Sequence, residues 1–220
     1  RCTCARHPSA SLTSIHTAIL ACFLALGLTG CDPAYRFNSV DISHKDYGAA
    51  LSLRDQHGQM RRMVDFRGKV VAVFFGYTQC PDVCPTNLAL FQHLIAKLGP
   101  DAERLAVVFV TLDPERDSAE KLAMYMNAFD PRFIALRGSP TETAQIAKAF
   151  GVIYAKQGDI ATGRYSLDHT ASTYLFDHLG KTRLLVRYGE TPERIEADLR
   201  QLLAAAPPQA GSLVSPGKAP

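Results

Sequence analysis

Apolar and polar residues alternate in blocks along the chain, and the blocks have the lengths of strands and helices. Residues 70–77 (VVAVFFGY) and 105–112 (LAVVFVTL) are short, unbroken apolar runs rich in β-branched and aromatic residues, which is typical of strands buried on both faces. Residues 88–98 lie between them and have the apolar spacing of an amphipathic helix. This part of the chain therefore predicts a strand, a helix and a second strand.

The second half of the chain continues the alternation. Its predicted elements are helices at 117–128, 141–150 and 192–205 and a β-hairpin with strands at 172–177 and 182–188 around a turn at 178–181. The first of these helices opens with Asp117 and Glu120, which resemble a capping box. Strands that alternate with helices imply an α/β domain whose central mixed sheet contains parallel pairs and carries helices on both faces.

The first 30 residues have a different pattern. Residues 15–30 carry no charge and follow Arg1 and Arg6, which is the layout of a secretory signal peptide. A transmembrane anchor is the less favoured alternative because a bilayer span needs about 20 apolar residues. We therefore expect a cleaved signal segment in front of the domain.

Cys31 marks the expected processing point. The apolar run ends Leu-Thr-Gly-Cys31, which resembles the lipobox of bacterial lipoproteins, where cleavage before the cysteine is coupled to lipidation of its sulfur. The alternative is a chance cysteine at the end of a signal. Asp32 resembles the residue that retains such lipoproteins in the inner membrane of a Gram-negative cell. The resemblance implies a lipid-anchored protein on the periplasmic face of the bacterial inner membrane.

These patterns divide the chain into four parts. They are a lipoprotein-type signal peptide at 1–30, a polar tether at 31–45, one domain at 46–205, and at 206–220 a tail rich in Pro, Gly, Ser and Ala that we expect to be disordered. The length of 220 residues fits one domain. A formal charge of +3 with 20% charged residues gives no sign of nucleic-acid binding.

Removal of the signal leaves few thiols. Three of the six cysteines lie within residues 1–30, so the mature chain would keep Cys31, Cys80 and Cys84. If Cys31 carries lipid, the two remaining thiols lie four residues apart in an oxidising compartment. Any thiol chemistry of the domain then belongs to this pair.

Cys80 and Cys84 lie between a predicted buried strand and a predicted helix. The N-terminus of a helix favours thiolate over thiol and makes cysteines there nucleophilic and able to bind metals. A separation of four residues on a helix puts the Cα atoms about 6 Å apart on one face, within range of a disulfide or of one metal ion. Three interpretations stay open: a structural disulfide, which would stabilise little because its loop is short, a redox-active dithiol, and a metal site with a third ligand.

Five histidines follow the signal as candidates for that ligand. Four occupy ordinary positions in the tether, in turns or within a helix: His44, His57, His93 and His178. His169 differs because it directly precedes a predicted buried strand. Its neighbour Asp168 could orient the imidazole or tune its basicity.

At these residues the sequence resembles the Sco/SenC family of copper proteins. The resemblance covers about residues 45–203 and rests on three motifs in the family's order, GYTQCPDVCP, VTLDPERD and LDHTASTYLFD. It implies a thioredoxin-like fold and one copper ion, as Cu(I) or Cu(II), bound by Cys80, Cys84 and His169 with Asp168 beside the site. It also implies delivery of copper to the CuA centre of cytochrome c oxidase.

The chemistry of these donors agrees with copper. Two thiolates and an imidazole suit Cu(I) and can also hold Cu(II), whereas structural zinc requires four protein ligands and the sequence offers no good fourth. Thioredoxin-like reductases carry a cis-proline immediately before the strand at 172–177, and here that position is Ala171. A cis bond at a non-proline residue costs about 2.5–4 kcal/mol, which favours metal binding over disulfide exchange.

The expected function is a metallochaperone rather than an enzyme. Its expected partners are the copper-binding subunit of cytochrome c oxidase, other periplasmic copper or thiol carriers, and the membrane, but no nucleic acid. The alternatives are a membrane-anchored thiol–disulfide oxidoreductase that uses Cys80 and Cys84 to keep the oxidase cysteines reduced, and a copper- or redox-responsive sensor. The motif at 113–117 (DPERD) is interpreted as a turn and helix start, with docking of a partner as the other possibility.

Overall fold

The computed structural model describes residues 36–206 of the chain. The expected signal peptide, Cys31 and the tail from residue 207 lie outside these residues. Within residues 36–206, none of the helices combines the length and the apolar character that a membrane span requires.

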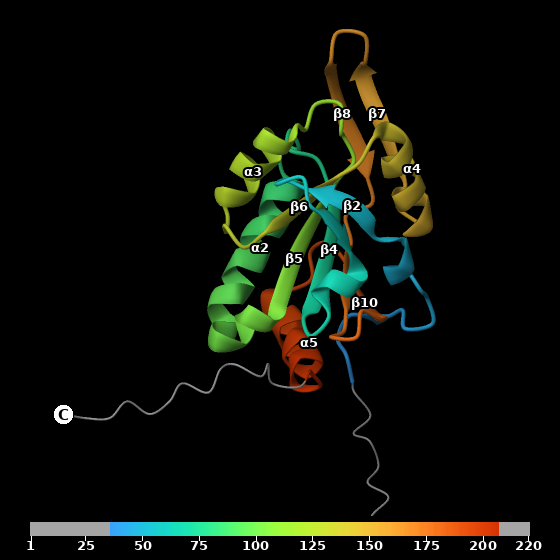
Figure 1. Ribbon diagram of the computed structural model, residues 1–220. Helices are drawn as coiled ribbons and strands as arrows, with labels where there is room; N and C mark the ends of the chain where they lie inside the picture. Colours follow the sequence, from blue (N-terminus) through green and yellow to red (C-terminus); the bar gives the residue numbers. More distant parts are fainter. Residues whose placement is uncertain (1–35, 207–220) are drawn as a thin grey trace, which may run out of the picture. The chain divides into compact units, whose positions relative to one another are not determined.

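A mixed sheet of eight strands forms the centre of the domain (Figure 1). Its strands, in spatial order, are β1 (Val40–Asp41), β10 (Thr182–Val186), β9 (Thr173–Phe176), β4 (Val70–Gly76), β5 (Leu105–Thr111), β6 (Ile134–Arg137), β2 (Ser52–Asp55) and β3 (Met60–Arg62). The pairs β4–β5 and β5–β6 are parallel, and the other neighbouring pairs are antiparallel. The prediction of a mixed sheet with parallel pairs is confirmed.

Strands β4 and β5 form the core of this sheet. All seven residues of each strand are buried, as their unbroken apolar runs predict. They pair in parallel register from Val70 with Leu105 to Gly76 with Thr111. The carboxyl ends of both strands therefore reach the same edge of the sheet, and the chain leaves β4 there through the segment that carries the two cysteines.

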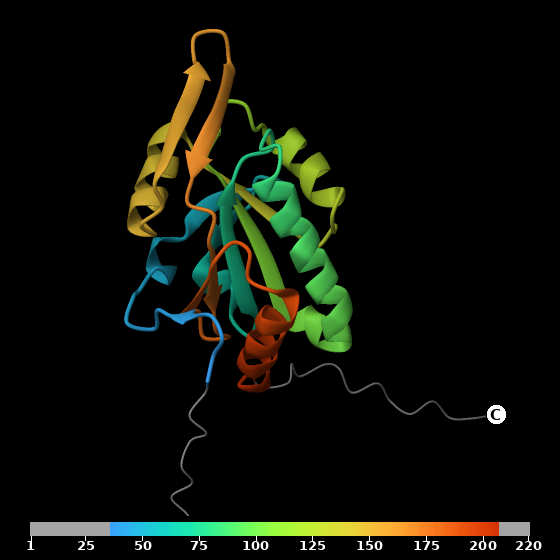
Figure 2. The same cartoon turned by 180° about the vertical axis from the view of Figure 1, so that it is seen from behind.

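Helices cover both faces of the sheet, as predicted. In both views α2 (Val83–Leu98), α3 (Ala119–Asn127) and α5 (Pro192–Ala204) lie on one face, and α4 (Pro140–Ala149) lies on the other (Figures 1 and 2). Residues 36–206 also contain three short 3₁₀ helices: η2 (Gly48–Ala50), η3 (Met63–Phe66) and η4 (Gly99–Arg104). The parallel strands are thus enclosed on both sides.

The expected capping box at Asp117 and Glu120 is wrong. Helix α3 begins at Ala119, and its N-cap is Ser118, whose hydroxyl accepts a hydrogen bond from the backbone N–H of Lys121. Asp117 cannot act as the cap because its carboxylate is fully buried and accepts hydrogen bonds from two threonines instead. A capping box occurs instead at α4, between Ser139 and Glu142.

The predicted C-terminal hairpin is confirmed as β9 and β10. Its turn closes with a hydrogen bond from the N–H of Gly180 to the carbonyl of Asp177 at 2.8 Å, and the φ of 77° at Gly180 is one that glycine adopts without strain. Strand β1 pairs with the outer side of β10. Residues 40 and 41 of the expected tether therefore belong to the sheet.

A second sheet, which the sequence did not predict, consists of β7 (Tyr154–Asp159) and β8 (Arg164–His169). This hairpin extends beyond the main sheet, next to α4 (Figure 2). The strands are mostly exposed and polar, so they lack the apolar alternation that marks a half-buried strand. His169 is the last residue of β8, and the hairpin therefore carries one of the predicted site residues.

Candidate metal centre

Cys80 and Cys84 lie at the carboxyl edge of the central parallel strands. The chain leaves β4 at Gly76, and Cys84 is the second residue of α2. Both cysteines are free thiols, but Cys80 is only partly buried whereas Cys84 is 0% exposed. This edge of an α/β sheet is where ligands bind in such folds.

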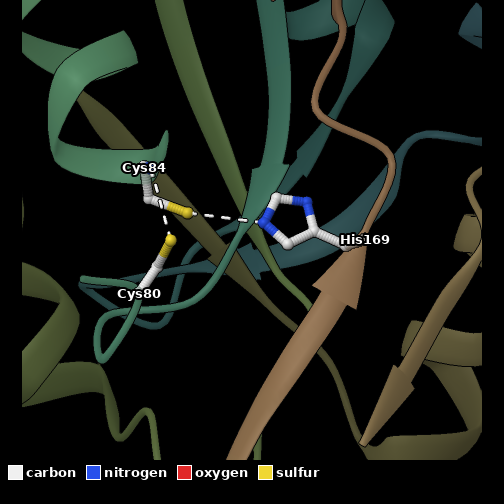
Figure 3. A group of neighbouring side chains, drawn as sticks. All are labelled: Cys80, Cys84 and His169. Atoms are coloured by element: carbon white, nitrogen blue, oxygen red, sulfur yellow. Dashed lines mark hydrogen bonds between the residues drawn. The ribbon is translucent and has the colours of Figure 1, made fainter. Parts of the chain in front are cut away.

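His169 reaches the same point from the end of β8. Its Nε2 atom lies 3.6 Å from the Sγ atom of Cys84, and the ligand atoms of Cys80, Cys84 and His169 all lie within 4.8 Å of one another. The imidazole and both sulfurs point toward a common centre (Figure 3). In the comparable case of zinc, bonds of about 2.3 Å to sulfur and 2.0 Å to nitrogen put ligand atoms at most about 4.6 Å apart, so one ion fits with little adjustment.

The backbone selects the tautomer of His169. Its Nδ1 atom lies 3.0 Å from the carbonyl oxygen of Thr170. A carbonyl only accepts hydrogen bonds, so Nδ1 carries the proton and Nε2 presents a lone pair to the two sulfurs. The ring is thus held in the form that binds a metal ion.

Asp168 lines the same cavity as Cys80 and His169, but no hydrogen bond joins its carboxylate to the imidazole among the described residues. The side chain of Asp168 is exposed, and the group that orients the imidazole is the carbonyl of Thr170. The sequence did not reveal this, because a backbone carbonyl leaves no signal in residue type.

Two aromatic rings, those of Phe74 and Tyr77, pack against the imidazole of His169. The rings of Phe74 and Tyr77 both make edge contacts with the ring of His169, at centroid distances of 6.2 and 6.0 Å. Phe74 lies in β4, and Tyr77 directly follows this strand. The central sheet therefore constrains the rotation of the imidazole, although His169 belongs to the separate hairpin.

The two thiols have different environments. Burial raises the pKa of the Cys84 thiol above its usual range, and nearby charge on Cys80 acts in the same direction. The expectation that the helix N-terminus favours thiolate at both cysteines is therefore wrong for Cys84 in the metal-free domain, because desolvation outweighs the helix dipole. A bound cation would reverse this balance, since a coordinating thiol loses its proton to the metal.

A shallow cavity of about 380 Å³ opens at the site. Cys80 and His169 line the cavity, together with Tyr77 and residues 81–83. Cys84 is absent from its lining and is fully buried. An ion bound by the three residues would be reached from solvent on the side of Cys80 and His169.

No fourth His, Cys, Asp or Glu ligand joins the three within residues 36–206. The other four histidines that follow the signal are also outside the group. A structural zinc site, which requires four protein ligands, does not fit this set, whereas two sulfurs and one imidazole suit copper.

Comparison with known proteins identifies the family. The sequence profile described as SCO1/SenC matches residues 40–204. The chain belongs to the SCO1/SenC family.

A mouse Sco relative, "Protein SCO2 homolog, mitochondrial", is 35% identical over 157 residues, which cover 70% of this chain and 62% of the mouse protein. The SCO2-like protein of Rickettsia felis is 36% identical over 61% of this chain and 66% of its own length. The chain thus spans less than two thirds of these curated relatives.

Solved Sco structures share the fold. The apo Sco1 protein of Thermus thermophilus is 38% identical, with a TM-score of 0.68 over 77% of this chain and 99% of that chain. ScoI of Bradyrhizobium japonicum, solved with copper bound, is 36% identical, with a TM-score of 0.63 over 69% of this chain and 96% of that chain. The thioredoxin-like α/β fold expected from the sequence is confirmed.

Gly76 is a site residue that the sequence analysis missed. A Cβ atom at this position would lie 2.6 Å from the Sγ atom of Cys84 and 2.8 Å from Cε2 of Phe109. The absence of a side chain at the end of β4 therefore makes the space that the buried sulfur occupies. Its position directly before the cysteine loop was the available signal.

We predict that Gly76→Ala lowers the free energy of unfolding by about 1–3 kcal/mol, because the added methyl group overpacks this region. It should also displace the Cys84 sulfur and change the spectrum of bound copper. Urea denaturation and absorption spectroscopy measure the two effects. In the double variant Gly76→Ala/Cys84→Ala part of the destabilisation should disappear, and equal effects of Gly76→Ala with and without the sulfur would contradict the explanation.

Proposed function

We propose that this Sco protein is a metallochaperone that binds one copper ion through Cys80, Cys84 and His169 and delivers it to the CuA centre of cytochrome c oxidase. The observation that carries the proposal is the convergence of these three ligand atoms within 4.8 Å. Soft sulfur ligands hold Cu(I), and the imidazole extends the set to Cu(II). Membership of the SCO1/SenC family and the similarity to a copper-bound ScoI support the choice of metal.

The arrangement of the site suits transfer. A three-coordinate ion at the wall of an open cavity leaves room for an incoming ligand, as catalytic metal sites do and closed structural sites do not. The lining of the cavity by Cys80 and His169 gives a partner direct access to two of the three ligands. Lipidation of Cys31 on the periplasmic face of the inner membrane would bring the domain to the membrane in which the oxidase is assembled.

The test uses the full-length protein, purified in detergent without chelators. We expect about one copper and no zinc per chain, and transfer of copper to a copper-free soluble CuA domain of the oxidase, seen as the appearance of the CuA spectrum. The variant Cys80→Ser/Cys84→Ser is the control and should neither bind nor transfer copper. A protein that binds copper but never yields it to the CuA domain would contradict delivery and leave copper binding intact.

One observation favours a second candidate, a thiol–disulfide oxidoreductase that keeps the oxidase cysteines reduced. Cys80 is partly exposed and Cys84 is fully buried, an asymmetry that suits attack by one thiol and resolution by the other. This function predicts reduction of a disulfide in the CuA domain that depends on both cysteines but not on His169. Thiol titration of the CuA domain after incubation with His169→Ala distinguishes it from copper delivery.

A further inference from the structure

The segment at 113–117, between β5 and α3, is more than a turn. Asp113 and Asp117 are 1% and 0% exposed. Arg137 of β6 anchors the backbone of the segment. Its guanidinium donates hydrogen bonds to the carbonyl of Asp117 at 2.9 Å and to the carbonyl of Pro114 at 2.8 Å. The backbone of the segment is therefore fixed to the core.

One end of the segment holds the cysteine loop. The carboxylate of Asp117 accepts hydrogen bonds from the backbone N–H of Thr78 at 3.1 Å and from its hydroxyl at 2.5 Å. The hydroxyl of Thr111, the last residue of β5, donates to the same carboxylate at 2.6 Å. Thr78 lies two residues before Cys80, so Asp117 ties the loop that carries the first sulfur to the end of the central sheet.

The other part of the segment holds the hairpin that carries His169. Nη1 of Arg116 donates to the carbonyls of Tyr165 and Gly163 at 2.8 and 3.2 Å, and its Cζ atom lies 3.5 Å above the centre of the Tyr165 ring. Asp113 orients this guanidinium through an ion pair with Nε and also accepts a hydrogen bond from the Tyr165 hydroxyl at 2.8 Å. Lys156 of β7 pairs with Glu115 in the same segment.

The hairpin needs such support because its own sheet has only two strands. Strand β8 pairs with β7 and with no other strand among residues 36–206. A two-stranded hairpin is marginally stable in water by itself. The free edge of β8 is instead covered by Arg116, whose side chain is only 14% exposed. The position of His169 at the end of β8 thus depends on contacts outside the hairpin, which are the packing of Leu167 in the core and the contacts with the segment 113–117.

We propose that Arg116 is a positioning residue of the metal site. Oriented by Asp113, it holds β8 against the core at the distance at which the imidazole of His169 faces the two sulfurs, while Asp117 fixes the cysteine loop from the same five-residue segment. The segment 113–117 therefore sets the distance between the two cysteines and His169. This inference depends on the ligand set in the proposed function.

A double-mutant cycle in the full-length protein tests the proposal. Arg116→Ala should weaken Cu(II) binding about 10–100-fold, the effect typical of residues that orient a metal ligand, and should change the sulfur-to-copper absorption bands. In the His169→Ala background the same substitution should have no further effect, because Arg116 acts through the imidazole. An equal loss in both backgrounds would overturn the proposal, as would unchanged binding in the single variant.

Arg164→Ala is the matched control. Arg164 is the first residue of β8, and its side chain is 80% exposed, so its removal takes the same charge from the region without touching the segment 113–117. It should leave copper affinity and spectra unchanged. If Arg164→Ala lost as much copper affinity as Arg116→Ala, the net charge of the region, and not the contacts of Arg116 with β8, would determine binding.

Hydrogen exchange of the copper-free protein gives a readout independent of metal binding. In Arg116→Ala, backbone amides at 154–169 should exchange at least about 10-fold faster, while those of β4 and β5 stay protected. Tyr165→Leu, which removes the stacked ring and the hydroxyl, should reproduce this pattern. It replaces Arg116→Ala in the experiment if Arg116→Ala does not fold. Unchanged exchange in the hairpin would overturn the proposal, and absence of copper binding in the wild type would contradict only the proposed function.

Discussion

His169→Ala is expected to weaken Cu(II) binding by at least about 100-fold and to leave binding of Cu(I) largely intact. Removal of groups that only orient a metal ligand costs about 10–100-fold, so loss of the ligand itself should cost more. The two remaining thiolates are soft ligands that suffice for Cu(I), whereas Cu(II) relies on the imidazole. Competition titrations with a chelator of known affinity, carried out separately for each oxidation state, measure both effects.

The control for this variant is His93→Ala. His93 is exposed on α2, the helix that contains Cys84, and it lies outside the group of three ligands. Its removal deletes an imidazole without changing the site. If His169→Ala bound Cu(II) as tightly as the wild type with the same spectrum, the proposed ligand set would be wrong.

Replacement of either cysteine by serine is expected to abolish copper binding at equimolar metal, but only one of the two should destabilise the fold. Cys84→Ser puts a hydroxyl into a fully buried, largely apolar position, which should lower the free energy of unfolding by about 1–3 kcal/mol. Cys80→Ser changes a partly exposed residue and should alter it by less than about 0.5 kcal/mol. Metal analysis and urea denaturation of the metal-free variants measure the two properties.

Cys84→Ala separates the two causes. Alanine removes the sulfur without adding a polar atom, so copper binding should be lost while the destabilisation reflects only the lost packing. Equal stability of the Cys80→Ser and Cys84→Ser variants would contradict the difference in burial between the two sulfurs.

The central part of the fold could be predicted from the sequence because its residues leave strong signals. Strands β4 and β5 and the hairpin of β9 and β10 consist of apolar runs between turns, and the helices show their own periodicity. The hairpin of β7 and β8 could not be predicted, since its exposed residues are polar on both faces. Its position depends on contacts made by Arg116, which no local pattern reveals.

The site was predicted more completely than its support. The motifs around Cys80, Cys84 and His169 indicated three ligands, and the structure brings these residues together. Asp168 was a plausible partner for the imidazole because it is adjacent in sequence, whereas the hydrogen bond to the ring nitrogen is made by the backbone carbonyl of Thr170. The buried Asp117 resembled a helix cap in sequence because acidic residues are common there, yet its partners are threonines distant in the chain or before the helix.

The unequal depth of the two sulfurs would give the proposed copper transfer a direction. An acceptor ligand would enter through the cavity, which is lined by Cys80 and His169 but not by Cys84. Under the proposed function, Cys80 and His169 would be the first ligands exchanged and Cys84 the last. The ion would then pass from one protein to the other by ligand exchange, without dissociating into solvent.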